Sequence, residues 1–175
     1  CGPCEYYGSL ERKPFTTYRP TLFIQRRELL MGDYQAQRDP GKITMGIPRA
    51  LLIFYQQFPF CRTFFKETGF NVIISRESDK QLVTKSLESV STETCLPVEL
   101  MHGHILDLFE QGADYIFTPF IVNAKAKEGN PTTNCNCPWI QSYPFMAKSA
   151  LREKVPTEKM LIPTLHFKFF KNALF

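Results

Sequence analysis

The sequence predicts an α/β domain built on a doubly wound, mostly parallel four-stranded sheet of the flavodoxin or Rossmann-like type, with an irregular N-terminal arm. Four short apolar runs that suit buried strands alternate along the chain with helical patterns. Such alternation requires crossover connections, which place helices on both faces of a parallel sheet. The length of 175 residues and the 43% hydrophobic, 22% charged composition suit one globular domain with a substantial core.

Residues 1–41 are expected to form an irregular arm or linker, and residues 42–175 the α/β domain. The arm is rich in breaker residues, and Asp39-Pro-Gly41 marks its end. Within the arm, residues 22–31 suit either a short helix or an extended segment. The chain begins with Cys1 rather than Met. We therefore expect it to be a fragment of a larger multidomain protein.

The first half of the domain predicts two strands and three helical segments. A strand over 43–47 ends at Pro48, and helical patterns follow over 50–57 and 59–68, with a break at Pro59. The β-branched run 70–75 predicts a buried strand. A helix is expected over 78–87, with Ser78 as its N-cap.

The second half predicts two more strands and the strongest helix, which covers 97–111 and ends at Gly112. A strand over 114–118 ends at Pro119, and residues 119–137 are expected to form a long loop. A helix over 138–153 and a last strand over 160–165 complete the domain. Pro163 favours an edge or terminal position for that last strand.

Charge and hydropathy exclude several classes of function. The net charge is +4, but the basic residues are dispersed without a run of five, which argues against a nucleic-acid-binding face. No apolar run approaches the ~18 residues of a membrane span, and no secretory signal opens the chain. Six cysteines are too few for a disulfide scaffold. We therefore expect a cytoplasmic protein whose cysteines serve metal or redox chemistry.

Two cysteines share one local context. Cys95 precedes Leu-Pro97 at the start of the strongest helix, and Cys137 precedes Pro138 at the start of another. Both sulfurs should then lie at helix N-termini, where free N–H groups and the macrodipole stabilise the thiolate that zinc and iron–sulfur clusters require. The alternative is a pair of buried structural thiols that cap the helices. Cys135 is either a third ligand or a bystander.

The remaining candidates are weaker. Cys61 lies among phenylalanines in a predicted helix, which favours a buried, inert thiol. Cys1-Gly-Pro-Cys4 has the spacing of a thioredoxin motif but lacks the strand and helix that the motif needs. His102 lies two helical turns from Cys95 and is either a neighbour of the metal site or an ordinary core or surface histidine. Arg49 follows the first strand and is either an anion-binding residue of the crevice or a surface residue.

A series of motifs resembles a known family. The motifs that carry the resemblance are Met45-Gly-Ile-Pro-Arg-Ala-Leu-Leu-Ile-Phe-Tyr55, Phe58-Pro-Phe60, Glu67-Thr-Gly-Phe70, Glu93-Thr-Cys-Leu-Pro97, His102-Gly-His104, Gly112-Ala-Asp-Tyr-Ile-Phe117 and Asn136-Cys-Pro138. Over about residues 20–170 the chain resembles the DUF2229 domain of large activator-like proteins related to 2-hydroxyacyl-CoA dehydratases. In that family the domain follows ATPase modules of the BadF/BcrA type.

The resemblance implies a cofactor, partners and a role. The domain is similar to dehydratase subunits that hold a [4Fe–4S] cluster, and Cys95 and Cys137 stand at the ligating positions. Those subunits supply a further cysteine from much later in the chain, so this segment is not expected to be catalytically complete. The ATPase modules would drive a low-potential electron into the cluster, and a dehydratase-like subunit would receive it. The alternatives are a docking domain with structural or zinc-binding cysteines, and a dithiol oxidoreductase acting through Cys1 and Cys4.

Overall fold

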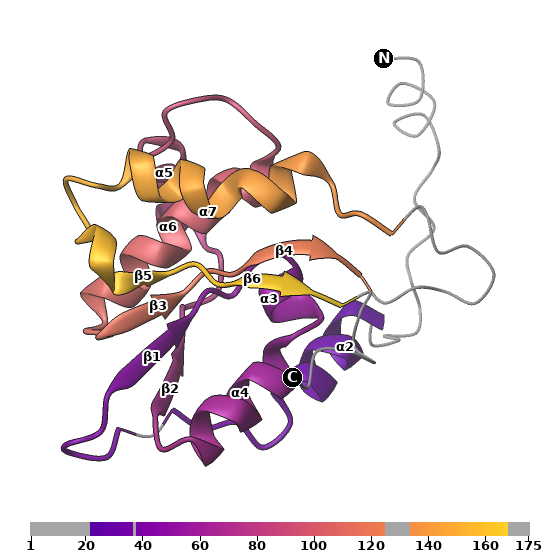
Figure 1. Cartoon of the computed structure of the whole chain (residues 1–175), viewed down its shortest axis with the longest axis vertical. Helices are drawn as coiled ribbons and strands as arrows, with labels where there is room; N and C mark the ends of the chain where they lie inside the picture. The colour runs from indigo at the N-terminus through magenta and orange to yellow at the C-terminus, as the bar shows by residue number, and fades with distance from the viewer. Residues whose placement is uncertain (1–21, 37, 125–133, 168–175) are drawn as a thin grey trace, which may run out of the picture. The chain divides into compact units, whose positions relative to one another are not determined.

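The computed structural model describes residues 22–36, 38–124 and 134–167 (Figure 1). The chain divides into two compact units, residues 1–32 and residues 33–175. The first contains α2 (Leu22–Met31), so this segment adopts the helical one of its two expected conformations. All other helices and strands belong to the second unit. The start of this unit is anchored by two hydrogen bonds: the Tyr34 hydroxyl donates to the Val72 carbonyl at 3.1 Å, and the Asp39 amide donates to the Asn71 side chain at 3.0 Å.

The second unit is built on a four-stranded parallel sheet (Figure 1). Its strands are β1 (Thr44–Ile47), β2 (Asn71–Ile74), β3 (Tyr115–Phe117) and β5 (Met160–Leu161), in the order β2-β1-β3-β5. Met45 of β1 pairs with Val72 on one side and Tyr115 on the other, which makes β1 an inner strand; all four of its residues are buried. The order is that of the flavodoxin-type sheet, and the predicted fold class is confirmed.

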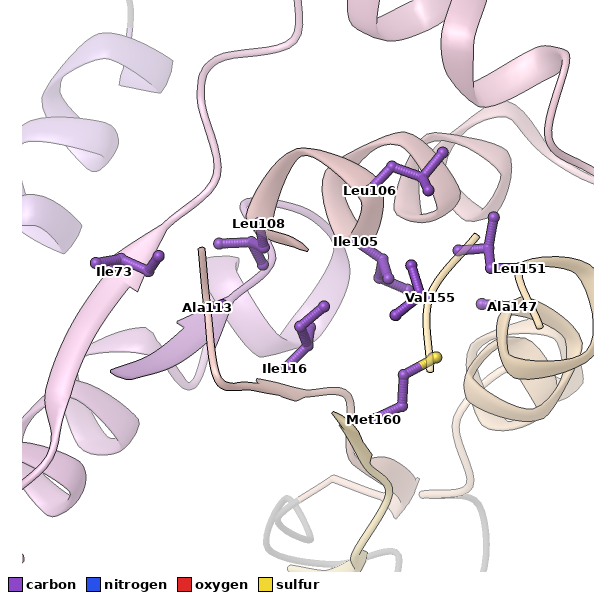
Figure 2. Close-up of a cluster of buried hydrophobic side chains, with 10 residues drawn as sticks. All are labelled: Ile73, Ile105, Leu106, Leu108, Ala113, Ile116, Ala147, Leu151, Val155 and Met160. Carbon is purple, nitrogen blue, oxygen red and sulfur yellow. The ribbon is translucent and has the colours of Figure 1, made fainter. Parts of the chain in front are cut away.

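Helices cover both faces of this sheet, as neighbouring residues of β3 show. The ring of Phe117 packs at 5.0 Å against Phe65 of α4 (Phe58–Glu67), which follows the short α3 (Leu51–Tyr55). Ile116 points the other way, into a cluster with residues of α6 (Leu96–Glu110) and α7 (Pro138–Ala150) (Figure 2). Among the helices of the described residues, none combines the length and apolarity that a bilayer crossing needs.

Two glycines let α6 approach its neighbours closely. A Cβ on Gly46 of β1 would lie 3.1 Å from a methyl group of Leu108, so the absence of a side chain seats α6 on the sheet. A Cβ on Gly103 would lie 2.9 Å from the carbonyl oxygen of Leu82 in α5 (Lys80–Leu87), and still closer to Ser86. Gly103 therefore sets the contact between α5 and α6, which is why a glycine stands between two histidines in the middle of a helix.

The expected loop over 119–137 is wrong at its start, where the chain forms β4 (Phe120–Asn123). The expected last strand is divided into β5 and β6 (Thr164–His166), and β4 pairs with β6 in a separate two-stranded parallel sheet. The amides of Thr118 and Phe120 donate to the carbonyls of Leu161 and Pro163. Pro119 separates β3 from β4, and Pro163 separates β5 from β6. The two chain segments stay paired on both sides of these prolines, so the β4–β6 pair continues the β3–β5 pair beyond the edge of the main sheet.

The expected N-cap at Ser78 is also wrong. Helix α5 begins one residue later, with Asp79 as its N-cap, and the Asp79 carboxylate accepts a 2.8 Å hydrogen bond from the amide of Leu82. The Ser78 hydroxyl instead contacts the Nε2 atom of His104 at 3.1 Å. Either residue type suits an N-cap, and the contact with a helix distant in sequence decides between them.

We predict that Gly103→Val lowers the free energy of unfolding by about 2 kcal/mol or more, because the backbone of α5 must move to admit the new side chain. The measurement is equilibrium denaturation by urea. Ser149→Val on the exposed side of α7 is the control, with an expected change within about 0.5 kcal/mol. A Gly103→Val protein as stable as wild type would show that the two helices are not held at this distance.

Candidate functional site

The candidate ligand loops lie at the carboxyl edge of the main sheet. Helix α6 packs on β1 and β3 and leads through Gly112 into the start of β3. It therefore runs antiparallel to the strands and begins at the edge where they end (Figure 1). Helix α7 leads into β5 in the same sense. In parallel α/β sheets ligands bind beyond this edge, and the edge carries Cys95 and Cys137 at the starts of the two helices.

Cys95 is the N-cap residue of α6. Its backbone is extended, and its carbonyl accepts the first helical bond from the amide of Val98 at 2.8 Å. The thiol is free and exposed, and the side chain makes no capping hydrogen bond. The loop in front is held by Glu99, a buried carboxylate that accepts a 2.7 Å hydrogen bond from the amide of Thr94. The alternative of a buried, helix-capping structural thiol therefore does not hold for Cys95.

Cys137 stands at the N-cap of α7 in the same way, free, exposed and without a capping bond. The segment before it is anchored to β4 by the Asn136 amide, which donates to the Val122 carbonyl, and by the Asn136 side chain, which donates to the Ile121 carbonyl, both at 3.0 Å. Cys135 pairs with Asn123 in an antiparallel bridge and is also exposed. In an extended segment, residues 135 and 137 lie on the face opposite Asn136. Both thiols thus lie on one face of an anchored segment.

These residues fit an iron–sulfur cluster by donor type, because cysteine thiolates are its usual ligands. A [4Fe–4S] cluster takes four such ligands, one more than the three thiols of these loops. Across residues 22–36, 38–124 and 134–167, no three His, Cys, Asp or Glu side chains are grouped closely enough to hold a metal ion as they stand. A cluster at this edge would have to draw the two loops together and take a ligand from outside them.

Buried polar atoms supply a second indication of fit. In the described part of the chain, two buried side-chain atoms have no hydrogen-bond partner: the hydroxyl of Thr94 and the amide nitrogen of Asn134. Each lies directly before a candidate ligand, Cys95 or Cys135. Unpartnered buried polar atoms are rare in native proteins, and a strained segment, an ordered water or an ion can account for them. Sequence patterns carry no signal for them, since Thr and Asn are ordinary loop residues.

Arg49 lies beyond the carboxyl end of β1, where the sequence places it. Its guanidinium pairs with Glu77 at 2.8 Å and lies 5.5 Å from the centre of the Phe54 ring, and its amide donates to the Ser75 hydroxyl. Leu51, two residues on, has φ of +51°, a left-handed conformation that costs a non-glycine residue about 1 kcal/mol or more. The turn out of β1 is therefore strained and pinned, a feature the sequence does not indicate.

The two histidines of α6 are buried core residues. The Nδ1 atom of His102 pairs with the Glu99 carbonyl at 3.1 Å, and burial lowers the pKa of its ring. His104 bridges the Ser75 hydroxyl at 2.8 Å and the Ser78 hydroxyl at 3.1 Å, which suits a neutral ring that donates at one nitrogen and accepts at the other. Burial lowers the pKa of His104 to about 4.

Cys61 is 2% exposed in α4, so its predicted burial is confirmed, and burial raises the pKa of its thiol to about 12. Cys1 and Cys4 lie outside the described residues. A cavity of about 530 Å³ is lined by residues of β4, α3 and α4 and by Asn136. Leu52, Phe60 and Ile121 give it apolar walls, and it also has the carboxamides of Gln56, Gln57 and Asn123.

Comparison with known proteins assigns the family. The family model described as "CoA enzyme activase uncharacterised domain (DUF2229)" matches residues 44–175. The chain therefore belongs to the CoA enzyme activase domain family DUF2229, and the expected resemblance to this domain is confirmed over residues 44–175. Searches of curated proteins and of solved structures gave no match.

We predict that iodoacetamide modifies Cys95, Cys135 and Cys137 in the folded protein and leaves Cys61 unmodified, because only the first three thiols are exposed. Peptide mass spectrometry of the alkylated chain gives the extent at each site. Alkylation in urea is the control and should label Cys61 as well. Equal labelling of Cys61 in the folded and unfolded protein would contradict its burial.

We predict that His104 makes stability depend on pH between its ordinary pKa of 6.5 and its folded value of about 4. In this interval the unfolded chain binds the proton more tightly, so the free energy of unfolding falls as the pH is lowered and is fully retained above pH 6.5. Asp107 partly offsets the effect by raising this pKa, whereas Arg49 and Arg76 add to it.

The measurement is urea denaturation at several pH values between 4.5 and 7.5, a range that follows from the two pKa values. Other groups also titrate in this range, so the readout is the difference between wild type and His104→Gln, which should shrink as the pH falls. A difference that does not change with pH would show that His104 is not held neutral by the fold.

Proposed function

We propose that this domain is the iron–sulfur electron-transfer module of an ATP-driven activator system for a 2-hydroxyacyl-CoA dehydratase-like enzyme. Cys95 and Cys137 would ligate a [4Fe–4S] cluster, with Cys135 as a third donor. The observation that carries the proposal is the matched placement of two free, exposed cysteines at the N-caps of α6 and α7, which both start at the carboxyl edge. Membership of an activase domain family fits an activator-like role.

The residues of the chain would bind and orient the centre. The helix N-termini behind Cys95 and Cys137 carry amide groups without helical acceptors, and their partial positive charge favours an anionic group held by thiolates. Glu99 fixes the first loop through Thr94, and Asn136 fixes the second through β4. A bound cluster would supply one-electron transfer at low potential, which acid–base side chains cannot perform.

The partners follow from the same proposal. ATPase modules of the BadF/BcrA type, in the same or another chain, would deliver the electron, and a dehydratase-like subunit would receive it. The exposed face shared by Cys135 and Cys137 leaves the ligand set open to a residue from a neighbouring domain or chain. On this view the fourth ligand would come from outside the two loops, and the domain alone would not complete a reaction.

The experiment is anaerobic reconstitution of the chain with ferrous iron and sulfide. We predict broad visible absorption from sulfur-to-iron charge transfer, with iron and sulfide bound to the chain in equal amounts. Cys95→Ala and Cys137→Ala should each lose most of this absorption, because each removes a ligand. Cys61→Ala is the matched control and should retain it, since Cys61 is buried away from solvent. Equal absorption in all four proteins would overturn the assignment.

A docking role is the second candidate, and the surface of α4 favours it. Phe60 and Phe64 are 57% and 51% exposed, and their rings lie nearly parallel with centres 6.2 Å apart. Large exposed aromatic side chains are typical of protein interfaces. Metal analysis separates the candidates: bound zinc without iron, stable in air, would support a docking domain with a structural metal, and bound iron with sulfide would support the electron-transfer module.

A further inference from the structure

The cavity lined by α3, α4 and β4 has the size and the lining of a small-molecule site. Its volume of about 530 Å³ lies within the roughly 300–1,000 Å³ that is typical of such sites. Leu52, Phe60 and Ile121 supply apolar walls from three different elements. None of its described lining residues has an ionisable side chain. The polar side chains of the lining are all carboxamides: Gln56, Gln57, Asn123 and Asn136.

Three of these carboxamides keep hydrogen-bonding groups without a partner. Within the described residues the side chains of Gln56 and Gln57 make no hydrogen bond, although Gln57 stands at the N-cap of α4. The Asn136 side-chain nitrogen donates to the Ile121 carbonyl at 3.0 Å, and no described residue donates to its side-chain oxygen. A carboxamide offers both N–H donors and a carbonyl acceptor. The cavity can therefore hydrogen-bond a neutral ligand from two of its walls.

Both walls are held by contacts that leave these groups unused. On the β4 side, the Asn123 side chain accepts a 2.7 Å hydrogen bond from the Phe167 amide. On the α3 side, Leu52 directly follows the left-handed Leu51, whose φ is +51°. Strained backbone of this kind tends to cluster at ligand-binding sites, where the surrounding structure holds it in place. The cavity is thus formed by the fold itself, as small-molecule sites usually are.

We propose that this cavity binds an uncharged organic molecule that combines an apolar group with amide or carbonyl groups. The apolar group packs against the apolar walls, and Gln57 and Asn136 hydrogen-bond to the polar groups. Asn136 lies on the face of its segment opposite Cys135 and Cys137. The inference therefore goes beyond the proposed function and does not rest on it.

The experiment measures the binding of a neutral probe to the whole chain by isothermal titration calorimetry. The probe is N-acetyl-phenylalanine N-methylamide, which carries a phenyl ring and two amides. A ligand of this size is expected to bind with a Kd of about 0.1–1 mM. Two charged relatives are the matched probes: N-acetyl-phenylalanine, with a carboxylate, and phenylalanine N-methylamide, with an ammonium group. Each should bind at least about tenfold more weakly, because no described lining residue can pair with its charge.

Variants show whether the neutral probe binds in this cavity. Phe60 is 57% exposed, so Phe60→Glu should fold and place a carboxylate in an apolar wall. It should weaken binding at least about tenfold. Gln57→Leu removes a hydrogen-bonding side chain and should weaken binding about three- to tenfold. Phe145→Glu is the matched control, because Phe145 is 54% exposed on α7 and is not among the described lining residues; its Kd should equal that of wild type.

Three results would overturn the proposal: no saturable binding of the neutral probe to wild type, equal Kd values for the three probes, or binding that Phe60→Glu and Gln57→Leu leave unchanged. If the far-UV circular dichroism spectrum shows that Phe60→Glu does not fold, Gln57→Leu decides by itself. None of these measurements involves iron or a cysteine. A failure here is therefore distinct from a failure of the reconstitution that tests the electron-transfer module.

Discussion

The burial of α6 is the constraint on which the rest of the domain depends. Ten of its fifteen residues are buried, from Val98 to Leu108, between the sheet, α5 and α7. Gly46 and Gly103 set how closely the sheet and α5 can approach it. A helix packed on so many sides has a fixed axial position and rotation, which fixes where the helix begins. Cys95 owes its place at the carboxyl edge to packing that begins one turn away.

Polar side chains of α6 also hold the loops at both of its sides, the loop after β2 and the loop before α6. The Asp107 carboxylate accepts a hydrogen bond from the Arg76 amide, and the His104 ring hydrogen-bonds to the Ser75 and Ser78 hydroxyls. The loop after β2 is therefore fixed to α6 by polar contacts as well as by burial. Glu99 extends this to the loop before the helix. The second ligand segment depends on β4 in place of α6. The two cysteine loops are thus anchored through different contacts, one through Glu99 and the other through β4.

Much of the fold and the position of both candidate cysteines could be predicted from the sequence, and the predictions that are wrong have physical causes. The spacing of Val98, Met101 and Ile105 predicts α6 because that pattern reports burial on one helical face, and Pro97 and Pro138 mark the helix starts. Pro119 was misleading, because a proline that ends one strand does not prevent the next residues from pairing beyond it. Other features depend on contacts between segments that are distant in sequence, and no local pattern contains them. They are the left-handed conformation of Leu51, the N-cap at Asp79 and the unpartnered side-chain atoms of Thr94 and Asn134.

The most direct test of the account is a comparison of cysteine alkylation before and after anaerobic loading with iron and sulfide. Cys95 and Cys137 start exposed on separate loops, so protection of both in the same step requires one shared centre. We expect the two thiols to become protected together, at the same extent of iron loading, and we expect removal of iron by a chelator to restore the reactivity of both. Loading that leaves either thiol as reactive as before would contradict the central claim, because the two helix starts would not then bind one centre.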